Sequence, residues 1–250
     1  MICFPRLQAE ENSLRSLAPL LDYLTEMANH HRKNPTEPIP IVAIGGCPGV
    51  GKTYLNQLIF QELQQKSVRC AILPLDDFVL SPEEFMKLGV ESDQNHRWFK
   101  RDALHACLSL IHSNVRLLET PTRDQRTQEV GLRMLDLSEC DLLFFEGSYA
   151  LCTREPLHFF IYAKAGIFIE ASAEDIYQWK WEREQTRVVP RTAEKFAKSM
   201  EIVFSDFNQH IAYSKENARF VIRKDHLHRY TLEVNEPLDK TVLNLTFLLL

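Results

Sequence analysis

An eight-residue stretch, GCPGVGKT from Gly46 to Thr53, constrains this chain more than any other feature of its 250 residues. It matches the pattern G-x-x-x-x-G-K-[ST], which is typical of loops that bind phosphate. The apolar run IPIVAIGG, residues 39–46, precedes it and indicates a buried strand. Residues 52–66, KTYLNQLIFQELQQK, indicate a helix. Because this motif belongs between a strand and a helix, the sequence predicts a phosphate-binding loop.

Each residue type in the loop suits a polyphosphate ligand. The glycines let successive backbone N–H groups turn inward, and the start of the helix adds positive potential. We expect Lys52 to reach the β- and γ-phosphates of a nucleoside triphosphate and the Thr53 hydroxyl to bind Mg²⁺. Cys47 lies at this electropositive helix start, so we also expect a reactive thiol. The predicted nucleotide contacts are Gly46, Cys47, Pro48, Gly49, Val50, Gly51, Lys52, Thr53 and Tyr54.

The composition excludes several classes of function. A formal net charge of −5 argues against a general nucleic-acid binder, which needs a basic surface. No run approaches the ~20 apolar residues of a membrane-spanning helix, and the short apolar tail 241–250 is expected to pack on the domain. The six cysteines are scattered without a C-x-x-C pair, as expected for reduced thiols. We therefore expect a cytoplasmic protein with a small-molecule substrate, no nucleic-acid or membrane partner, and possible pairing as a homodimer.

Apolar strands alternate with helical patterns along the chain. This alternation predicts an α/β fold with a doubly wound, mainly parallel β-sheet flanked by helices. Residues 1–38 are expected to form an N-terminal helix and linker, and residues 39–250 the main domain, with a helical lid at about 176–215. Further strands are predicted at 68–75, 141–147, 166–171, 218–222 and 228–234, helices at 7–30, 100–112, 155–162, 173–187 and 193–215, and a long polar loop at 119–131.

Three acidic residues follow predicted strands. Ligands of parallel sheets bind at the carboxyl ends of the strands, so Asp76, Asp77 and Glu146 are expected near the phosphate loop. Asp141 begins its strand and would lie roughly 15 Å away, at about 3.3 Å per residue, so it is excluded as a metal ligand. Glu146 could bind Mg²⁺ with Thr53 or polarise a nucleophile. The alternative for Glu146 is a turn-capping role.

The pair Asp76-Asp77 could supply a base that takes a proton from an attacking hydroxyl. The alternative is a strand-to-helix turn, where Asp is favoured for its backbone hydrogen bonds. In an extended stretch, successive side chains point to opposite faces, so only one of the two could face an acceptor. The apolar neighbours of the pair need burial and favour Asp76 for that position.

Basic residues recur in the region of the expected lid. Arg183, Arg187 and Arg191 are spaced by four, and on one continuous helix they would form a cationic face that stabilises charge during phosphoryl transfer. The alternative is a solvated face paired with neighbouring glutamates. His96 and Arg123 lie in polar connections and could contact a substrate, although most such residues are simply solvated.

Several segments, in this order and spacing, resemble the phosphoribulokinase/uridine kinase family of P-loop kinases, which includes pantothenate kinase and glycerate kinase-like branches. The resemblance covers about residues 39–222. It is carried by the phosphate loop, LPLDDFVL (73–80), TPTRDQRTQ (120–128), FFEGSYAL (144–151), IYQWKWEREQTR (176–187) and NARFVI (217–222). Val79 departs from the Tyr or His usual in two branches, and Arg123 replaces a loop tyrosine, so no single branch fits.

The resemblance implies an ATP- and Mg²⁺-dependent kinase that phosphorylates a hydroxyl on a nucleoside, pantothenate, glycerate or sugar. It assigns the acceptor contact to Asp76 and carries over Glu146. The expected catalytic residues are Lys52, Asp76, Glu146, Arg183 and Arg187, and the expected substrate contacts are Asp76, Phe78, His96, Arg123 and Tyr149. The alternative is a nucleotide-dependent NTPase switch that acts on a protein partner. The absence of the guanine-binding motifs Asn-Lys-x-Asp and Thr-Lys-x-Asp excludes a typical GTPase.

Overall fold

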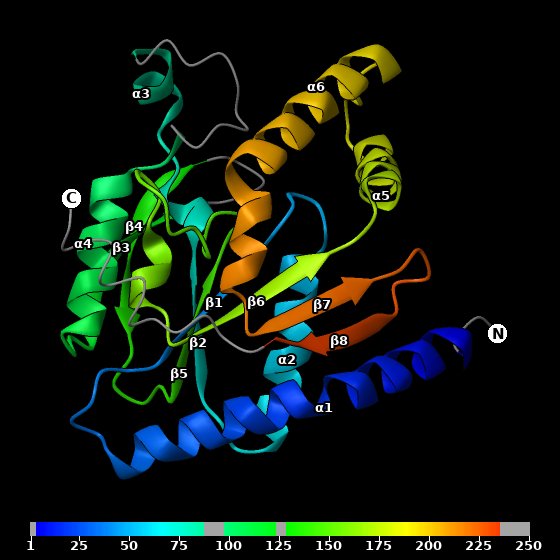
Figure 1. Cartoon of the computed structure of the whole chain (residues 1–250). Coiled ribbons are helices and arrows are strands. Elements are labelled where there is room, and N and C mark those ends of the chain that lie inside the picture. Colours follow the sequence, from blue (N-terminus) through cyan, green and yellow to red (C-terminus); the bar gives the residue numbers. More distant parts are fainter. Residues whose placement is uncertain (1–3, 88–97, 124–128, 236–250) are drawn as a thin grey trace.

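The computed structural model describes residues 4–87, 98–123 and 129–235 of the chain (Figure 1). A six-stranded sheet forms its centre, in the order β2-β5-β1-β6-β7-β8. Neighbouring strands are parallel except β8, which runs antiparallel to β7. The strands are β1 (Ile41–Gly46), β2 (Cys70–Pro74), β5 (Leu142–Glu146), β6 (Ala165–Glu170), β7 (Phe220–Lys224) and β8 (Tyr230–Val234). The mainly parallel α/β sheet predicted from the sequence is confirmed.

Helices cover both faces of this sheet (Figure 1). Strand β5 shows why: Leu143 and Phe145 pack into the core on the side of α4, whereas Leu142 and Phe144 pack into the core on the side of α1 and α2. A strand buried on both faces reads as one apolar run, as LLFF does here. The helices are α1 (Phe4–Lys33), α2 (Lys52–Gln65), α3 (Pro82–Lys87), α4 (Arg101–His112), α5 (Ala173–Gln185) and α6 (Ala193–Asp206).

Short turns complete the described chain. Helix α3 begins with a reciprocal cap, because the Glu84 amide donates to the Ser81 hydroxyl and the Ser81 amide donates to the Glu84 carboxylate. The helix expected at 193–215 ends at Asp206 and continues as a π turn and a 3-10 turn. The turns are η1 (Leu75–Phe78), η3 (Phe159–Tyr162), η4 (Phe207–Ile211) and η5 (Ala212–Asn217).

The polar loop predicted at 119–131 is wrong at its two described ends, and residues 124–128 lie outside the described part of the chain. The structure has an antiparallel two-stranded ribbon there, β3 (Leu117–Arg123) and β4 (Val130–Asp136). Alternation explains it, since Leu118, Thr120 and Leu135 are buried while the residues between them are more exposed. Glu119, on the exposed side of β3, is one of the polar residues that suggested a loop.

The N-terminal helix is part of the main core. In α1, Leu17, Leu20 and Leu24 are fully buried, and the Ser16 hydroxyl donates to the Tyr230 carbonyl of β8 at 2.6 Å. The helix lies alongside β8 and α2 (Figure 1). None of the helices in the described ranges is long and apolar enough to cross a bilayer. The tail 241–250 and His96 lie outside the described residues.

Asp141, excluded above as a metal ligand, is a buried anchor between α1 and β5. Its carboxylate accepts hydrogen bonds from the Arg32 side chain, at 2.9 and 2.6 Å, and from the Arg69 amide at 2.7 Å. Burial alone would raise the pKa of Asp141, but the hydrogen bonds from the two arginines lower it to about 2. The ionised carboxylate is therefore the form that stabilises the fold.

Replacing Asp141 by Asn should reduce the free energy of unfolding at pH 7 by about 2–3 kcal/mol, the scale for a hydrogen-bonded buried charge. A pKa lowered in the folded state stabilises the protein above the unfolded value, and this contribution is lost as the pH falls from about 4 towards 2. Denaturant unfolding at several pH values measures this change in the free energy of unfolding. Asp22→Asn removes an exposed surface pair with Lys66 and should change stability by less than about 1 kcal/mol. Equal effects of the two substitutions would contradict the anchoring role.

Candidate active site

The phosphate loop connects β1 to α2 as predicted, and its glycines are required by geometry. Gly46, Gly49 and Gly51 have φ angles of 140°, 96° and 103°, in the region that favours glycine. A Cβ atom on Gly46 would lie 2.3 Å from the Ile169 carbonyl oxygen. The loop therefore lies directly on the neighbouring strand β6, with α2 starting at Lys52.

Lys52 is buried, and its ammonium lies over its own loop. Nζ donates to the carbonyl oxygens of Gly46 at 3.1 Å and Cys47 at 3.2 Å, and to the Ser148 hydroxyl at 3.0 Å. These are three neutral acceptors for three N–H donors. The positive charge at the centre of the loop has no carboxylate within ion-pair distance among the described residues.

Two more lysines flank the loop. The methylene groups of Lys180, from α5, pack on Gly49. A Cβ atom added to Gly49 would lie 2.5 Å from Cδ of Lys180. Lys224, at the end of β7, donates to the Val50 carbonyl at 3.3 Å and lies over the Trp179 ring, 3.8 Å from its centroid. Burial lowers the pKa of each lysine to about 8. Neither lysine forms an ion pair with a carboxylate of the described residues, so three lysine side chains lie at the loop.

Glu146 and Thr53 lie side by side next to these lysines. The Thr53 hydroxyl donates to a Glu146 carboxylate oxygen at 3.5 Å. The register of the sheet pairs Glu146 with Ile44 on one side and Pro74 on the other, which brings the ends of β5, β1 and β2 together. Burial raises the pKa of Glu146, and the nearby Lys52 charge opposes that shift.

The pair fits Mg²⁺ by its chemistry. Mg²⁺ takes oxygen ligands, commonly one or two protein groups completed by water and substrate phosphate. A hydroxyl and a carboxylate are such a set, and the described residues contain no cluster of three or more His, Cys, Asp or Glu that could bind a metal ion alone.

Asp76 is exposed and Asp77 is buried, although the extended backbone expected for this pair is not present. They lie in the 3-10 turn η1 and not in an extended stretch. Asp76 is exposed at the end of β2, and its charge helps to raise the pKa of Glu146. Asp77 is buried; it accepts a hydrogen bond from the Arg123 amide at 3.1 Å and forms an ion pair with the Arg133 guanidinium at 3.2 Å. Asp77 thus fixes the β3–β4 ribbon to the turn that carries Asp76.

The arginine face predicted for the lid is wrong. Helix α5 ends at Gln185, so Arg187 and Arg191 lie in the connection to α6. Both pair with buried Glu184, at 3.5 and 2.7 Å. The hydrogen bond from Arg191 is the main reason that the pKa of Glu184 is lowered to about 2. Only Arg183 of the three lies on α5, where its charge contributes to the lowered pKa of Lys180.

Several solved structures with a similar fold are described as kinases, although no protein-family model and no curated protein sequence matches the chain. D-glycerate 3-kinase from Cryptococcus neoformans superposes with a TM-score of 0.67 at 12% identity, covering 88% of this chain and 99% of that one. Phosphoribulokinase from Rhodobacter spheroides superposes with a TM-score of 0.59 at 16% identity, covering 75% of this chain and 71% of that one. A protein described as a possible uridine kinase from Bacillus stearothermophilus superposes with a TM-score of 0.54 at 16% identity, covering 80% of this chain and 98% of that one.

This chain has the P-loop kinase fold. The likeness agrees with the family resemblance of the sequence segments. At these identities it fixes the arrangement of strands and helices, and the roles of single residues depend on the geometry of this chain. In the P-loop kinase fold, the loop at Gly46–Thr53, the turn at Asp76 and the strand end at Glu146 share one edge of the sheet.

Two predicted substrate contacts are corrected. Phe78 is fully buried in the core, so its ring has no surface for a substrate. Tyr149 is 4% exposed, and its hydroxyl donates to the Asp206 carboxylate, which fixes the segment after β5 to α6. Arg123 lies at the end of β3 with its guanidinium 5.9 Å from the Trp98 ring centroid. Tyr54 is 42% exposed on the first turn of α2, next to Thr53.

The expected reactivity of Cys47 is also wrong. Its side chain is 2% exposed and packs in the core between the sheet and α2. Burial raises the pKa of the Cys47 thiol to about 11, despite the opposing charges of Lys52 and Lys180. Only the backbone of Cys47 faces the lysine of the loop.

The sequence analysis did not single out three residues of this site, Lys180, Lys224 and Ser148. Lys224 ends the last parallel strand, and Ser148 follows Glu146-Gly147, so the rule that ligands bind at the carboxyl ends of strands could have found both.

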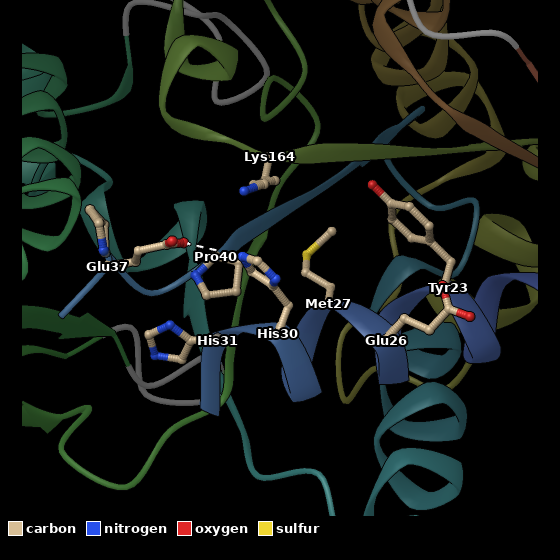
Figure 2. A pocket seen from close by; sticks show the side chains of 9 residues that line it. Tyr23, Glu26, Met27, His30, His31, Glu37, Pro40 and Lys164 are labelled. Atoms are coloured by element: carbon tan, nitrogen blue, oxygen red, sulfur yellow. Dashed lines mark ion pairs between the residues drawn. The ribbon is translucent and has the colours of Figure 1, made fainter. Parts of the chain in front are cut away.

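A separate cavity of about 320 Å³ lies under the C-terminal half of α1 (Figure 2). Figure 2 shows Met27 and His30 of α1 extending towards Pro40 and Lys164, with His30 and Glu37 paired at 3.5 Å. Pro40 and Lys164 precede β1 and β6, so the cavity is at the amino ends of the strands. The six-residue strand β1 separates it from the phosphate loop by roughly 20 Å.

Proposed function

We propose that this protein transfers the γ-phosphoryl group of ATP to a hydroxyl of a small metabolite. The observation that carries the proposal is the group of Lys52, Lys180 and Lys224 around the phosphate loop, without a carboxylate partner in the described chain. Burial lowers the pKa of Lys180 and Lys224, and a triphosphate would supply negative charge that favours their protonated forms. The kinase names of the similar structures support the same reading.

In this proposal each residue has a defined task. The loop amides and Lys52 bind the phosphates, and Thr53 and Glu146 hold Mg²⁺, which neutralises phosphate charge when it is bound. Asp76, exposed beside Glu146, orients the acceptor hydroxyl and accepts its proton. Lys180, with Arg183 beside it on α5, covers the loop and helps to exclude water.

Arg187 keeps a proposed part in the lid, although its present partner is Glu184. The acceptor is proposed to belong to the nucleoside, pantothenate, glycerate or sugar type, with Arg123 and His96 among its contacts. A homodimer and a cytoplasmic location stay predictions from the sequence.

A metabolite screen tests the proposal. ADP release from Mg-ATP should be slow for the protein alone and rise at least tenfold with one hydroxylated compound, with a phosphorylated product detected by mass spectrometry. Lys52→Met should remove most, but not all, of this rise, because it removes the central cation of the loop. A rise that requires a protein and no small acceptor would contradict the kinase and favour the switch. Failure to bind ATP would exclude both.

A further inference from the structure

Among the residues that the structure describes, Ser148 is the one outside the phosphate loop that holds the Lys52 ammonium. Its hydroxyl oxygen accepts from Nζ at 3.0 Å, and the other two acceptors are carbonyls of the loop itself. The contact links residues that are 96 positions apart in the sequence. It therefore depends on the packing of β5 beside β1.

The backbone around Ser148 is held tightly. The Gly147 amide donates to the Ile44 carbonyl at 3.0 Å, and the Ala150 amide donates to the Gly147 carbonyl at 3.1 Å. A Cβ atom at Gly147 would lie 2.3 Å from the side chain of Leu75, so the turn is packed against η1. The half-buried Ser148 hydroxyl is thus presented to Lys52 by a fixed turn.

The direction of this contact matters for the reaction. Ser148 lies two residues after Glu146, and the Glu146 carboxylate accepts from the hydroxyl of Thr53, the neighbour of Lys52. The contact with Ser148 therefore ties the Lys52 ammonium to the side of the loop where β5 ends, and there the transferred group and the acceptor would meet in the proposed reaction. The two carbonyls alone would hold Lys52 over the loop without selecting this side.

We infer that Ser148 is a positioning residue, which aims Lys52 at the reacting phosphoryl group; the inference rests on the proposed kinase function. A group that orients an existing cation affects the transition state more than the binding of the nucleotide. The hydroxyl accepts from the ammonium, so a residue that keeps a hydroxyl keeps the role.

The experiment compares Ser148→Ala with Ser148→Thr. The alanine variant should lower kcat by about 10- to 100-fold, somewhat less than the loss of a donor that touches the transition state directly. Its dissociation constant for Mg-ATP should change by less than about threefold. The threonine variant should recover most of the turnover. Ser109→Ala, on the exposed side of α4, is the matched control and should leave both quantities unchanged.

A double-mutant cycle with Lys52→Met separates this role from a structural one. If Ser148 acts through Lys52, the alanine substitution should have no further effect on the residual turnover of Lys52→Met. An undiminished effect in that background, or full turnover of Ser148→Ala alone, would overturn the inference. A wild-type protein that binds Mg-ATP but phosphorylates no acceptor would instead overturn the proposed function, and the positioning role with it.

Discussion

Asp76→Asn should lower kcat by about 10²–10⁴-fold, the span usual for the loss of a general base. Asn is nearly isosteric with Asp but cannot accept a proton at neutral pH. The exposed position of Asp76 at the end of β2, beside Glu146 and away from the core, gives it access to an acceptor. Binding of Mg-ATP should persist, because the phosphate loop does not depend on this side chain. Steady-state kinetics with the acceptor from the screen, and a separate nucleotide titration, measure the two effects.

Asp77→Asn is the matched control one residue away. It should reduce kcat by less than about tenfold, yet lower the melting temperature, since Asn keeps a hydrogen bond with the Arg123 amide and loses the charge that pairs with Arg133. Burial raises the pKa of Asp77, but the Arg123 amide and the Arg133 guanidinium already occupy its carboxylate, which leaves it no access to an acceptor. If Asp77→Asn had the larger kinetic effect and both proteins were folded, the assignment of the base would be reversed.

The sequence was sufficient for the parts of the site that depend on local pattern. The phosphate loop needs glycine at positive φ angles, and the run GCPGVGKT has glycine at each of these positions. The acids at 76, 77 and 146 were placed by one rule, that strands of a parallel sheet end at one edge. The sheet confirms that rule, because Glu146 pairs in register with β1 and β2.

Contacts between distant segments could not be read in the same way. The β3–β4 ribbon looked like a loop, because only packing shows which side of each strand is buried. Spacing alone put Arg187 on a helix that ends at Gln185, and the buried carboxylate of Glu184 gives both following arginines a different partner. Cys47 was judged from its electropositive neighbours, whereas its burial decides its pKa.

Lys180 lies on a helix that the sequence predicts, but only its contact with Gly49 in the structure identifies it as a residue of the site. Lys180→Met keeps the methylene stem that packs on the loop and removes the charge. It should lower kcat/KM by about 10²-fold, as expected for one pre-organised cation at the transferred group. Arg187→Met tests a lid cation that Glu184 already pairs, and it should have a smaller effect. A larger loss of kcat/KM for Arg187→Met than for Lys180→Met would show that Arg187, and not Lys180, contacts the phosphates.

The same lysine should make nucleotide binding depend on pH. Burial lowers the pKa of Lys180 to about 8 in the absence of an anion, and a bound triphosphate favours the protonated form. Below pH 8 the lysine is charged before and after binding, so affinity should be flat; above pH 8 binding must take up a proton, so affinity should fall as the pH rises. Titrations of Mg-ATP from pH 7 to pH 9.5 measure this fall. Lys180→Met should flatten the profile in part, leaving the share of Lys224, whose pKa is also about 8. A profile unchanged by Lys180→Met would mean that this ammonium does not meet the phosphates.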